Sequence, residues 1–370
     1  MSESPVSEPG APDVPHTDAG PIWKRVLRGI VTLAFLILVF GFVLPQLADY
    51  RAVADYIRKV EPAEWALLAV FAGWFLIAYV FVFLSTLPSL RFREGFVVQT
   101  TATAINNSLP AGGAIALPIT YSQFLSWGFT PEAVTAALLT AGVWDQLARL
   151  ALPVFAVAAI AFLGDALWWM WIVSLGGVVV VVGAVWLVAR VLRSEETAIR
   201  VGSRLGRAVN WVLDKLRRDP VDMVEAAVQF RTNVRHVATG RWRPITLATL
   251  ANHASMAALF LVSLRAVGAS SDDVSTPWVI LAFALGRLLV MIPISPGGLG
   301  LVDLGFIGLL SLGWGQGADT DLLSAGVLLY RALSYLPPIP IGVGSWVFWR
   351  VNRRWHLDWR TERRGEIATP

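Results

Sequence analysis

The chain has 370 residues, of which 56% are hydrophobic and only 15% are charged, whereas a soluble domain carries about 25% charged residues. Several apolar stretches reach the roughly 20 residues that a membrane-spanning helix needs. The composition therefore excludes an ordinary soluble domain and predicts an all-α polytopic membrane protein. The formal net charge is +4 and there are no cysteines, which excludes disulfides and thiolate metal sites.

The chain begins with a polar stretch. Residues 1–21 contain several prolines and acids with little apolar mass, which predicts a disordered tail. The first predicted span is Val26–Ala48, and basic residues at its start place the N-terminus in the cytoplasm. We then expect a short amphipathic segment outside, over Asp49–Glu61, and a second span over Ala63–Leu87 that returns to the inside.

The next apolar stretch, Phe96–Trp127, is broken by the sequence NNSLPAGG at Asn106–Gly113. Thr130–Leu163 follows as a long predicted helix, and Ala166–Leu192 as a further span. Residues 193–243 are rich in arginine interleaved with apolar residues at helical spacing. This pattern predicts cytoplasmic amphipathic helices that lie on anionic lipid. Nothing that reads bases accompanies the charge, so no nucleic-acid partner is expected.

The second half repeats this order of features. A span is predicted over Pro244–Val267, followed by an acidic outer loop, GASSDDVSTP. Trp278–Ile294 then leads into a second break, with the sequence MIPISPGGLG. Asp321–Phe348 is the last long apolar stretch, and residues 351–370 form a basic tail that we place in the cytoplasm. About eight transmembrane helices are expected in all.

Two segments of the chain are similar to each other. LLTAGVWDQLARLALP (Leu138–Pro153) aligns without gaps to LLSAGVLLYRALSYLP (Leu322–Pro337), and a proline-containing Gly-Gly break lies upstream of each. These matches favour an internal duplication. Within a membrane domain over 22–350, repeat one is predicted at about 63–163 and repeat two at about 244–350.

The charges around the two units indicate that they are inverted. A consistent topology lets each broken segment return, as a re-entrant hairpin, to the face from which it came: the first hairpin from the cytoplasm and the second from outside. Irregular backbone at membrane depth is tolerated where it is buried in protein or lines a water-filled cavity. Paired breaks in inverted halves indicate a substrate site near the midplane. The alternative, tight turns between short full spans, stays open.

Few polar side chains lie inside the predicted spans, and intramembrane charges usually face the interior. Asp145 and Arg149 are spaced i, i+4 and share a helix face. The arginines suit phosphate, because a planar guanidinium fork matches phosphate oxygens. Each group also has a structural alternative. Asp145 and Arg149 would form an ion pair, and Asp303 would cap a helix N-terminus. Arg287 and Arg331 would snorkel or bond carbonyls of the broken helices, and His253 would simply pack. The candidates from this reasoning are Asn106, Asn107, Asp145, Arg149, His253, Arg287, Asp303 and Arg331.

Catalysis finds little support in the sequence. The four histidines are scattered, and there is neither a Walker loop nor a Gly-x-Ser-x-Gly motif. We therefore expect no catalytic residues, no metal and no cofactor. Two alternatives remain: a membrane enzyme such as a polyprenyl-lipid phosphatase, for which Ser295 and Asp303 are the local candidates, and an accessory subunit for a cell-envelope synthase.

Two motifs resemble those of a known family. PISPGGLGLVDLGFIGLLSLG, followed by LLSAGVLLYRALSYLPPIPIG, resembles the closing signature of the lysylphosphatidylglycerol synthase transmembrane-region family, also called flippase-like domain proteins. NNSLPAGGAIALPITYSQFLSWGFTPEAVTAALLTAGVWDQLARLALP is similar to its earlier motif. The chain departs from the family where Asp303 replaces the usual Glu, and where Pro118–Tyr121 lacks a common Arg. The latter puts a headgroup contact at that position in doubt.

The resemblance implies translocation of a polar-headed lipid, anionic, aminoacylated or glycosylated, between the leaflets of a bacterial cytoplasmic membrane, without an ATPase of its own. The 370 residues contain no counterpart of the family's soluble aminoacyl-transferring domain, so we expect that this chain does not make lysyl-phosphatidylglycerol. The expected partners are a membrane phospholipid or glycolipid and an anionic lipid surface at 193–243. Carried over by position, the substrate-binding residues are Asn107, Pro110, Gly112, Gly113 and Asp145 at the inner hairpin and Pro296, Gly297, Gly298, Gly300, Asp303 and Arg331 at the outer one. Arg149 and Arg287, candidates as phosphate-binding arginines, are added to this set.

Overall fold

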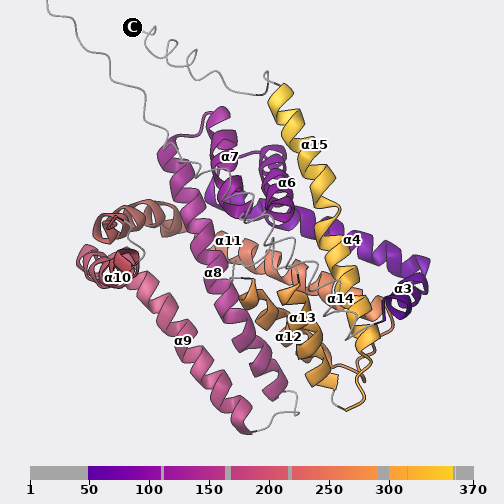
Figure 1. Ribbon diagram of the computed structural model, residues 1–370. Coiled ribbons are helices and arrows are strands. Elements are labelled where there is room, and N and C mark those ends of the chain that lie inside the picture. Colours follow the sequence, from indigo (N-terminus) through magenta and orange to yellow (C-terminus); the bar gives the residue numbers. More distant parts are fainter. Residues whose placement is uncertain are drawn as a thin grey trace, which may run out of the picture.

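The computed structural model describes residues 49–109, 112–162, 168–215, 219–290, 300–314, 316–352 and 355. The regular secondary structure in these residues is helical throughout (Figure 1). Two helices are apolar but shorter than a full span, and five stretches are long and apolar enough to cross a membrane: Pro62–Thr86, Pro131–Phe162, Leu175–Arg193, Val237–Ala266 and Thr320–Val351. The protein is therefore an all-α polytopic membrane protein, as predicted. The first predicted span and the two predicted tails lie outside the described residues, apart from the first residues of the C-terminal tail.

The first described helices are α3 (Tyr50–Arg58), α4 (Pro62–Ala78) and α5 (Val80–Thr86). The Asp49 side chain accepts a hydrogen bond from the Arg51 amide at 2.8 Å and so caps α3. α3 lies where the short amphipathic segment is predicted. Its Tyr56 hydroxyl donates to Asp319 at 2.7 Å, which ties α3 to the start of a later helix, and this hydrogen bond raises the pKa of Tyr56.

The first broken segment folds back on itself as a helical hairpin. α6 (Phe92–Ser108) and α7 (Gly112–Ser126) lie antiparallel, and Gln123 Nε2 donates to Thr101 Oγ1 at 3.3 Å between them. At 1.5 Å per residue each helix is at most about 25 Å long, short of the ~30 Å hydrocarbon core. The turn needs glycine, because a Cβ at Gly112 would lie 2.5 Å from the Asn106 Cα.

The second broken segment also forms an antiparallel pair, α12 (Thr276–Leu289) and α13 (Leu301–Trp314). Trp278 Nε1 donates to the Leu309 carbonyl at 2.8 Å. Nearer the break, Gly286 packs directly on the Phe306 ring. α12 ends a turn earlier than the sequence predicts. The break itself, residues 291–299, lies outside the described residues.

Two long helical stretches run past both hairpins. α8 (Pro131–Phe162) contains Pro153, and the second stretch consists of α14 (Thr320–Tyr335) and α15 (Pro338–Val351). The predicted apolar stretch Asp321–Phe348 is thus divided between two helices, because consecutive prolines after Leu336 remove two backbone N–H donors.

The two hairpins lie at opposite ends of α8 (Figure 1). Phe124 of α7 belongs to one hydrophobic cluster with Val134 near the start of α8. Leu281 of α12 packs instead with Ala156 and Ile160 in the last turns of α8. The hairpins therefore approach the middle of the bundle from opposite directions.

The arginine-rich region is helical. α9 (Trp168–Arg193) leads into α10 (Glu195–Lys215), which packs on the first part of α11 (Met223–Ala266). The backbone leaves the helical conformation at Thr239 and Gly240, where Gly240 has a φ of +109°. α11 therefore consists of an amphipathic helix beside α10 and a separate helix that enters the bundle.

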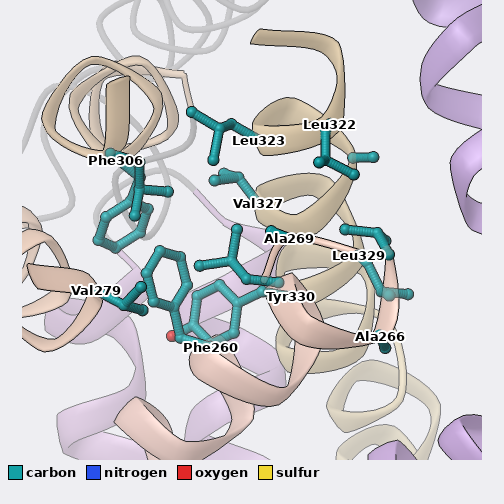
Figure 2. Packing of buried hydrophobic residues seen from close by; sticks show 14 of the residues in the cluster. Phe260, Ala266, Ala269, Val279, Phe306, Leu322, Leu323, Val327, Leu329 and Tyr330 are labelled. Atoms are coloured by element: carbon teal, nitrogen blue, oxygen red, sulfur yellow. The ribbon is translucent and has the colours of Figure 1, made fainter. Parts of the chain in front are cut away.

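The largest hydrophobic core cluster joins α11, α12, α13 and α14 (Figure 2). Its centre is aromatic: the Phe260 ring lies 4.6 Å from that of Phe306 and 5.1 Å from that of Tyr330, centroid to centroid. Such ring contacts add to the free energy of apolar burial. Because Tyr330 immediately precedes Arg331, this rigid cluster fixes the position of a candidate site residue.

α15 crosses α6 at very close range, which provides a test of the packing. A Cβ at Gly342 would lie 2.1 Å from the Thr100 carbonyl oxygen, whereas a Cβ at Gly344 would meet no atom within 4 Å. We expect Gly342→Ala to lower the free energy of unfolding by about 1–3 kcal/mol through overpacking. Gly344→Ala should leave it unchanged or raise it by up to about 1 kcal/mol through helix propensity. Thermal unfolding in detergent measures both, and equal stabilities would contradict this packing.

Candidate functional site

A polar cavity of about 250 Å³ lies where the ends of the two hairpins meet. It is lined by the second half of α6, the ends of α4, α12 and α14, and the middle turns of α8 and of the second part of α11. Asp145 stands 14 residues after the start of α8 and 17 before its end, so the cavity lies near mid-depth of the bundle. Its walls consist of Phe75, Tyr79, Gln99, Thr103, Asn106, Asn107, Asp145, Arg149, Asn252, Met256, Arg287, Val290, Tyr330, Arg331, Ser334 and Tyr335.

Asn107 connects the first hairpin to the end of α14. Its amide Nδ2 donates to the carbonyl oxygens of Ser334 and Tyr335, each at 3.5 Å. The Ser334 carbonyl would normally accept from the amide four residues later, but residue 338 is proline and has no N–H. The asparagine therefore offers a donor to backbone that the break between α14 and α15 has left without one.

Asp303 performs two tasks at the second hairpin. Its Oδ2 accepts from the Gly300 amide at 2.9 Å, which caps the start of α13. Its Oδ1 accepts from Arg331 Nε of α14, and the Asp303 side chain is only 1% exposed. Gly300 has a φ of +87°, a backbone conformation that favours glycine. The capping alternative for Asp303 is thus confirmed, together with a buried ion pair.

A second charged group lies across the cavity on α8. Arg149 Nη2 is 2.6 Å from Asp145 Oδ2, so the i, i+4 pair expected from the sequence forms. The other oxygen of Asp145 lies 3.1 Å from Nε2 of His253 on α11, whose side chain is fully buried. Asp145 therefore contacts two basic side chains.

The cations outnumber the anions around the cavity. Three arginines line it, Arg149, Arg287 and Arg331, and they are offset by Asp145 in the wall and by Asp303 behind Arg331. Among the described residues, Arg287 makes no ion pair, and its Nε has no hydrogen-bond acceptor. A buried cation without a counter-charge is costly. The cavity therefore suits an anion.

An apolar groove of about 470 Å³ lies beside the cavity, between α8, α9, α12 and α13. Leu150, which follows the cavity residue Arg149, lines the groove. On α12, Leu285 and Leu288 line it while the neighbouring Arg287 faces the cavity. Polar and apolar sites thus lie on the same two helices, at adjacent positions.

The structure brings most of the described candidates together. Asn107, Asp145, Arg149, Arg287 and Arg331 line the cavity, and Asp303 contacts one of them. Among the candidate glycines, Gly112 allows the close turn of the first hairpin, and Gly300 adopts a positive φ at the start of α13. Gly113 is exposed and has room for a side chain. The remaining candidates, Pro110, Pro296, Gly297 and Gly298, lie outside the described residues.

Several wall residues were not among the candidates. Gln99 and Thr103 precede Asn106 and Asn107 at helical spacing, so the four form one polar stripe on α6. This periodicity is visible in the sequence and could have identified both residues. Asn252 is adjacent to His253. Three further wall residues lie close to Arg331 in the chain: Tyr330, Ser334 and Tyr335. Tyrosine and serine are common in membrane helices, so these residue types do not indicate a binding site.

Comparison with known proteins gives one positive finding. The model of a family described as the lysylphosphatidylglycerol synthase TM region matches residues 26–342, which is most of the chain. No curated protein matches the sequence. Within the described part of the chain, no group of acidic or histidine side chains has the arrangement of a metal site.

The Asp303–Arg331 pair can be tested by a double-mutant cycle. Either Asp303→Asn or Arg331→Gln alone should lower the free energy of unfolding by about 3–5 kcal/mol, because each leaves a buried polar partner without its counter-charge. The double variant should lose less than the sum. The exposed Asp55–Arg58 pair is the control, with an expected effect below about 1 kcal/mol. Additive losses at Asp303 and Arg331 would contradict the pairing.

Proposed function

The chain belongs to the lysylphosphatidylglycerol synthase TM region family, and we propose on this premise that it moves an anionic, phosphate-bearing lipid between the two leaflets of a membrane. The observation that carries the proposal is the mid-depth cavity with three arginines, of which Arg287 makes no ion pair within the described residues. Multi-pass membrane association follows from the family and the five long apolar helices; the transported lipid is the proposal.

The cavity has the chemistry and the size for a headgroup. A guanidinium offers a planar set of donors that fits two phosphate oxygens at once. A volume of about 250 Å³ corresponds to roughly eight water molecules at their liquid density, enough for a phosphate with a small polar substituent. The neutral donors of Gln99, Asn106 and Asn252 in the wall suit the hydroxyl or amino groups of an aminoacylated or glycosylated headgroup.

The adjacent groove suits the lipid's acyl chains. A lipid that crosses the bilayer must keep its headgroup in a polar path while its chains remain in an apolar one. Arg149 and Leu150 are consecutive on α8, and so are Arg287 and Leu288 on α12. This placement lets one molecule put its phosphate in the cavity and a chain in the groove.

The arrangement of the hairpins supports an alternating path. We propose that the two units are inverted repeats and that their broken segments are re-entrant, the α6–α7 hairpin from the cytoplasmic side and the α12–α13 hairpin from the other. The opposite placement of the hairpins along α8 supports this. Movement of one hairpin end at a time would open the cavity to one leaflet and then to the other.

The amphipathic pair, α10 and the first part of α11, is proposed to lie on the anionic cytoplasmic leaflet of a bacterial membrane. Both helices carry arginines; Trp211 of α10 and Trp242, which directly follows the Gly240 kink, are exposed at 61% and 54%. Lys215 lies 3.7 Å over the Trp211 ring. Basic and tryptophan side chains together are typical of helices at the membrane interface. This placement gives both termini a cytoplasmic location.

The described geometry favours transport over the two alternatives. A phosphatase needs a nucleophile or paired carboxylates at the phosphate, but Asp145 is the sole carboxylate in the described cavity wall, and both its oxygens contact basic groups. Ser295 lies outside the described residues. An accessory subunit for a cell-envelope synthase would not need a cationic cavity at mid-depth.

Removal of the Arg287 guanidinium tests the proposed function. In liposomes, dithionite quenching of NBD-labelled phosphatidylglycerol reports exchange between leaflets. We expect Arg287→Gln to slow this exchange by about tenfold or more, because a hydrogen bond to a charged group contributes about 1.5–3 kcal/mol. Arg58→Gln, an exposed charge on α3, is the control and should exchange like the wild type. Exchange in wild-type vesicles no faster than in protein-free vesicles would overturn the proposal.

The inverted topology has its own test, helped by the absence of cysteine. Glu132 at the start of α8 and Asp272 between α11 and α12 are both exposed. A membrane-impermeant maleimide should label Glu132→Cys from the cytoplasmic face alone and Asp272→Cys from the opposite face alone. Labelling of both positions from one face would rule out the inverted arrangement.

A further inference from the structure

A buried histidine beside the cavity has no role in the steps described so far. His253 lies on α11 with a fully buried side chain, and its Nε2 is 3.1 Å from Asp145 Oδ1. Neither ring nitrogen has a well-aligned hydrogen-bond partner among the described residues. An imidazole that only fills space in an apolar core would normally have its nitrogens satisfied.

The neighbouring polar groups of α11 are also without partners. Thr249 Oγ1 and both amide atoms of Asn252 are buried and make no hydrogen bond within the described part of the chain. Thr249 and His253 are spaced i, i+4, and Asn252 lines the cavity. Buried polar atoms without protein partners are commonly satisfied by water. Asn252, His253 and Thr249 thus form a row of polar side chains on the second part of α11. The row extends from the cavity toward Gly240, the kink that separates this part of α11 from its amphipathic first part.

Charged and titratable groups from three other helices and from the end of α4 surround the cavity beside His253. They are Asp145 and Arg149 of α8, Arg287 of α12, Tyr330, Arg331 and Tyr335 of α14, and Tyr79 at the end of α4. With His253 neutral and the Asp303–Arg331 pair included, the group carries three positive and two negative charges. A proton on His253 raises its net charge from +1 to +2, and a bound phosphate lowers it again.

We propose that His253 and Asp145 form a proton-binding site that couples proton movement to movement of the lipid, an inference that rests on the proposed function. In the neutral ring the hydrogen is on Nε2, toward the carboxylate, and the Nδ1 lone pair is free. A proton from the aqueous phase passes through cavity water and forms an N–H bond at Nδ1. No bond in the lipid breaks, and the same proton leaves on the other side.

The coupling follows from the shared carboxylate. An imidazolium at 3.1 Å competes with Arg149 for Asp145, which releases guanidinium donors to the phosphate. The lipid's negative charge in turn favours the imidazolium. By linkage, the proton and the lipid raise each other's affinity by the same factor. The proton and the lipid therefore cross the membrane together, in the same direction.

A pH gradient across proteoliposomes tests this symport. Vesicles with wild-type protein, NBD-labelled phosphatidylglycerol and the membrane potential clamped by valinomycin and potassium receive a gradient of one pH unit. With one proton per lipid, the probe should accumulate up to about tenfold in the leaflet that faces the alkaline side. His253→Gln keeps an amide donor toward Asp145 but cannot take up a proton, so the probe should still exchange yet stay evenly distributed. Ser263→Ala is the control: its buried hydroxyl on the same helix donates to the Leu259 carbonyl and, within the described residues, to no other group. This variant should accumulate the probe like the wild type.

The outcomes separate the two proposals. Exchange in wild-type vesicles without a response to the gradient overturns proton coupling and leaves lipid translocation intact. This arm needs no substitution, so it decides the matter even if His253→Gln does not fold. A gradient response in His253→Gln equal to that of the wild type also overturns the role of His253. Wild-type vesicles that move no probe overturn the proposed function itself.

Discussion

Backbone that leaves a helix inside a membrane must find its hydrogen bonds in protein or water, and this constraint determines the centre of the molecule. At one hairpin the Asn107 amide reaches carbonyl groups of α14 that have lost their helical donors. At the other, the Gly300 amide finds Asp303, and Asp303 in turn needs Arg331. Asn107 reaches across from the other unit, whereas Asp303 caps its own helix and is held by Arg331 of α14. Contacts between helices therefore stabilise the broken backbone, and the polar cavity lies where these contacts meet.

The same constraint explains how charges can occupy mid-depth. A carboxylate or guanidinium buried alone would cost several kcal/mol, and each acid near the cavity has at least one basic neighbour. The aromatic cluster around Phe260 and Tyr330 holds α11 and α14 in fixed register behind these groups (Figure 2). Rigid packing thus positions the charges, and the charges in turn satisfy the broken backbone.

The sequence predicts contacts within a helix far better than contacts between helices. The Asp145–Arg149 pair follows from 3.6-residue periodicity, and the helix breaks follow from proline and glycine. The cap at Gly300 is likewise a local pattern. The approach of His253 to Asp145, or of Asn107 to Ser334, depends on how two helices rotate and slide against each other. Apolar residues surround these helices on most sides, so hydrophobic pattern alone does not fix that register. The groove beside the cavity is invisible to sequence reasoning for the same reason, because Leu150 and Leu288 look like any other apolar residues of a span.

Arg287, which forms no ion pair within the described residues, is the feature that best separates a transport site from a structural one. If the cavity served stability alone, an apolar side chain in place of Arg287 would be at least as good, since well-packed hydrophobic residues often match or exceed buried ion pairs. The guanidinium instead makes the empty cavity unfavourable and the anion-filled cavity favourable. A transporter benefits from such a difference, because the filled and empty forms can then prefer different hairpin positions. The hairpins end at the cavity from opposite directions, so the charge balance of the cavity acts on the two elements that would have to move.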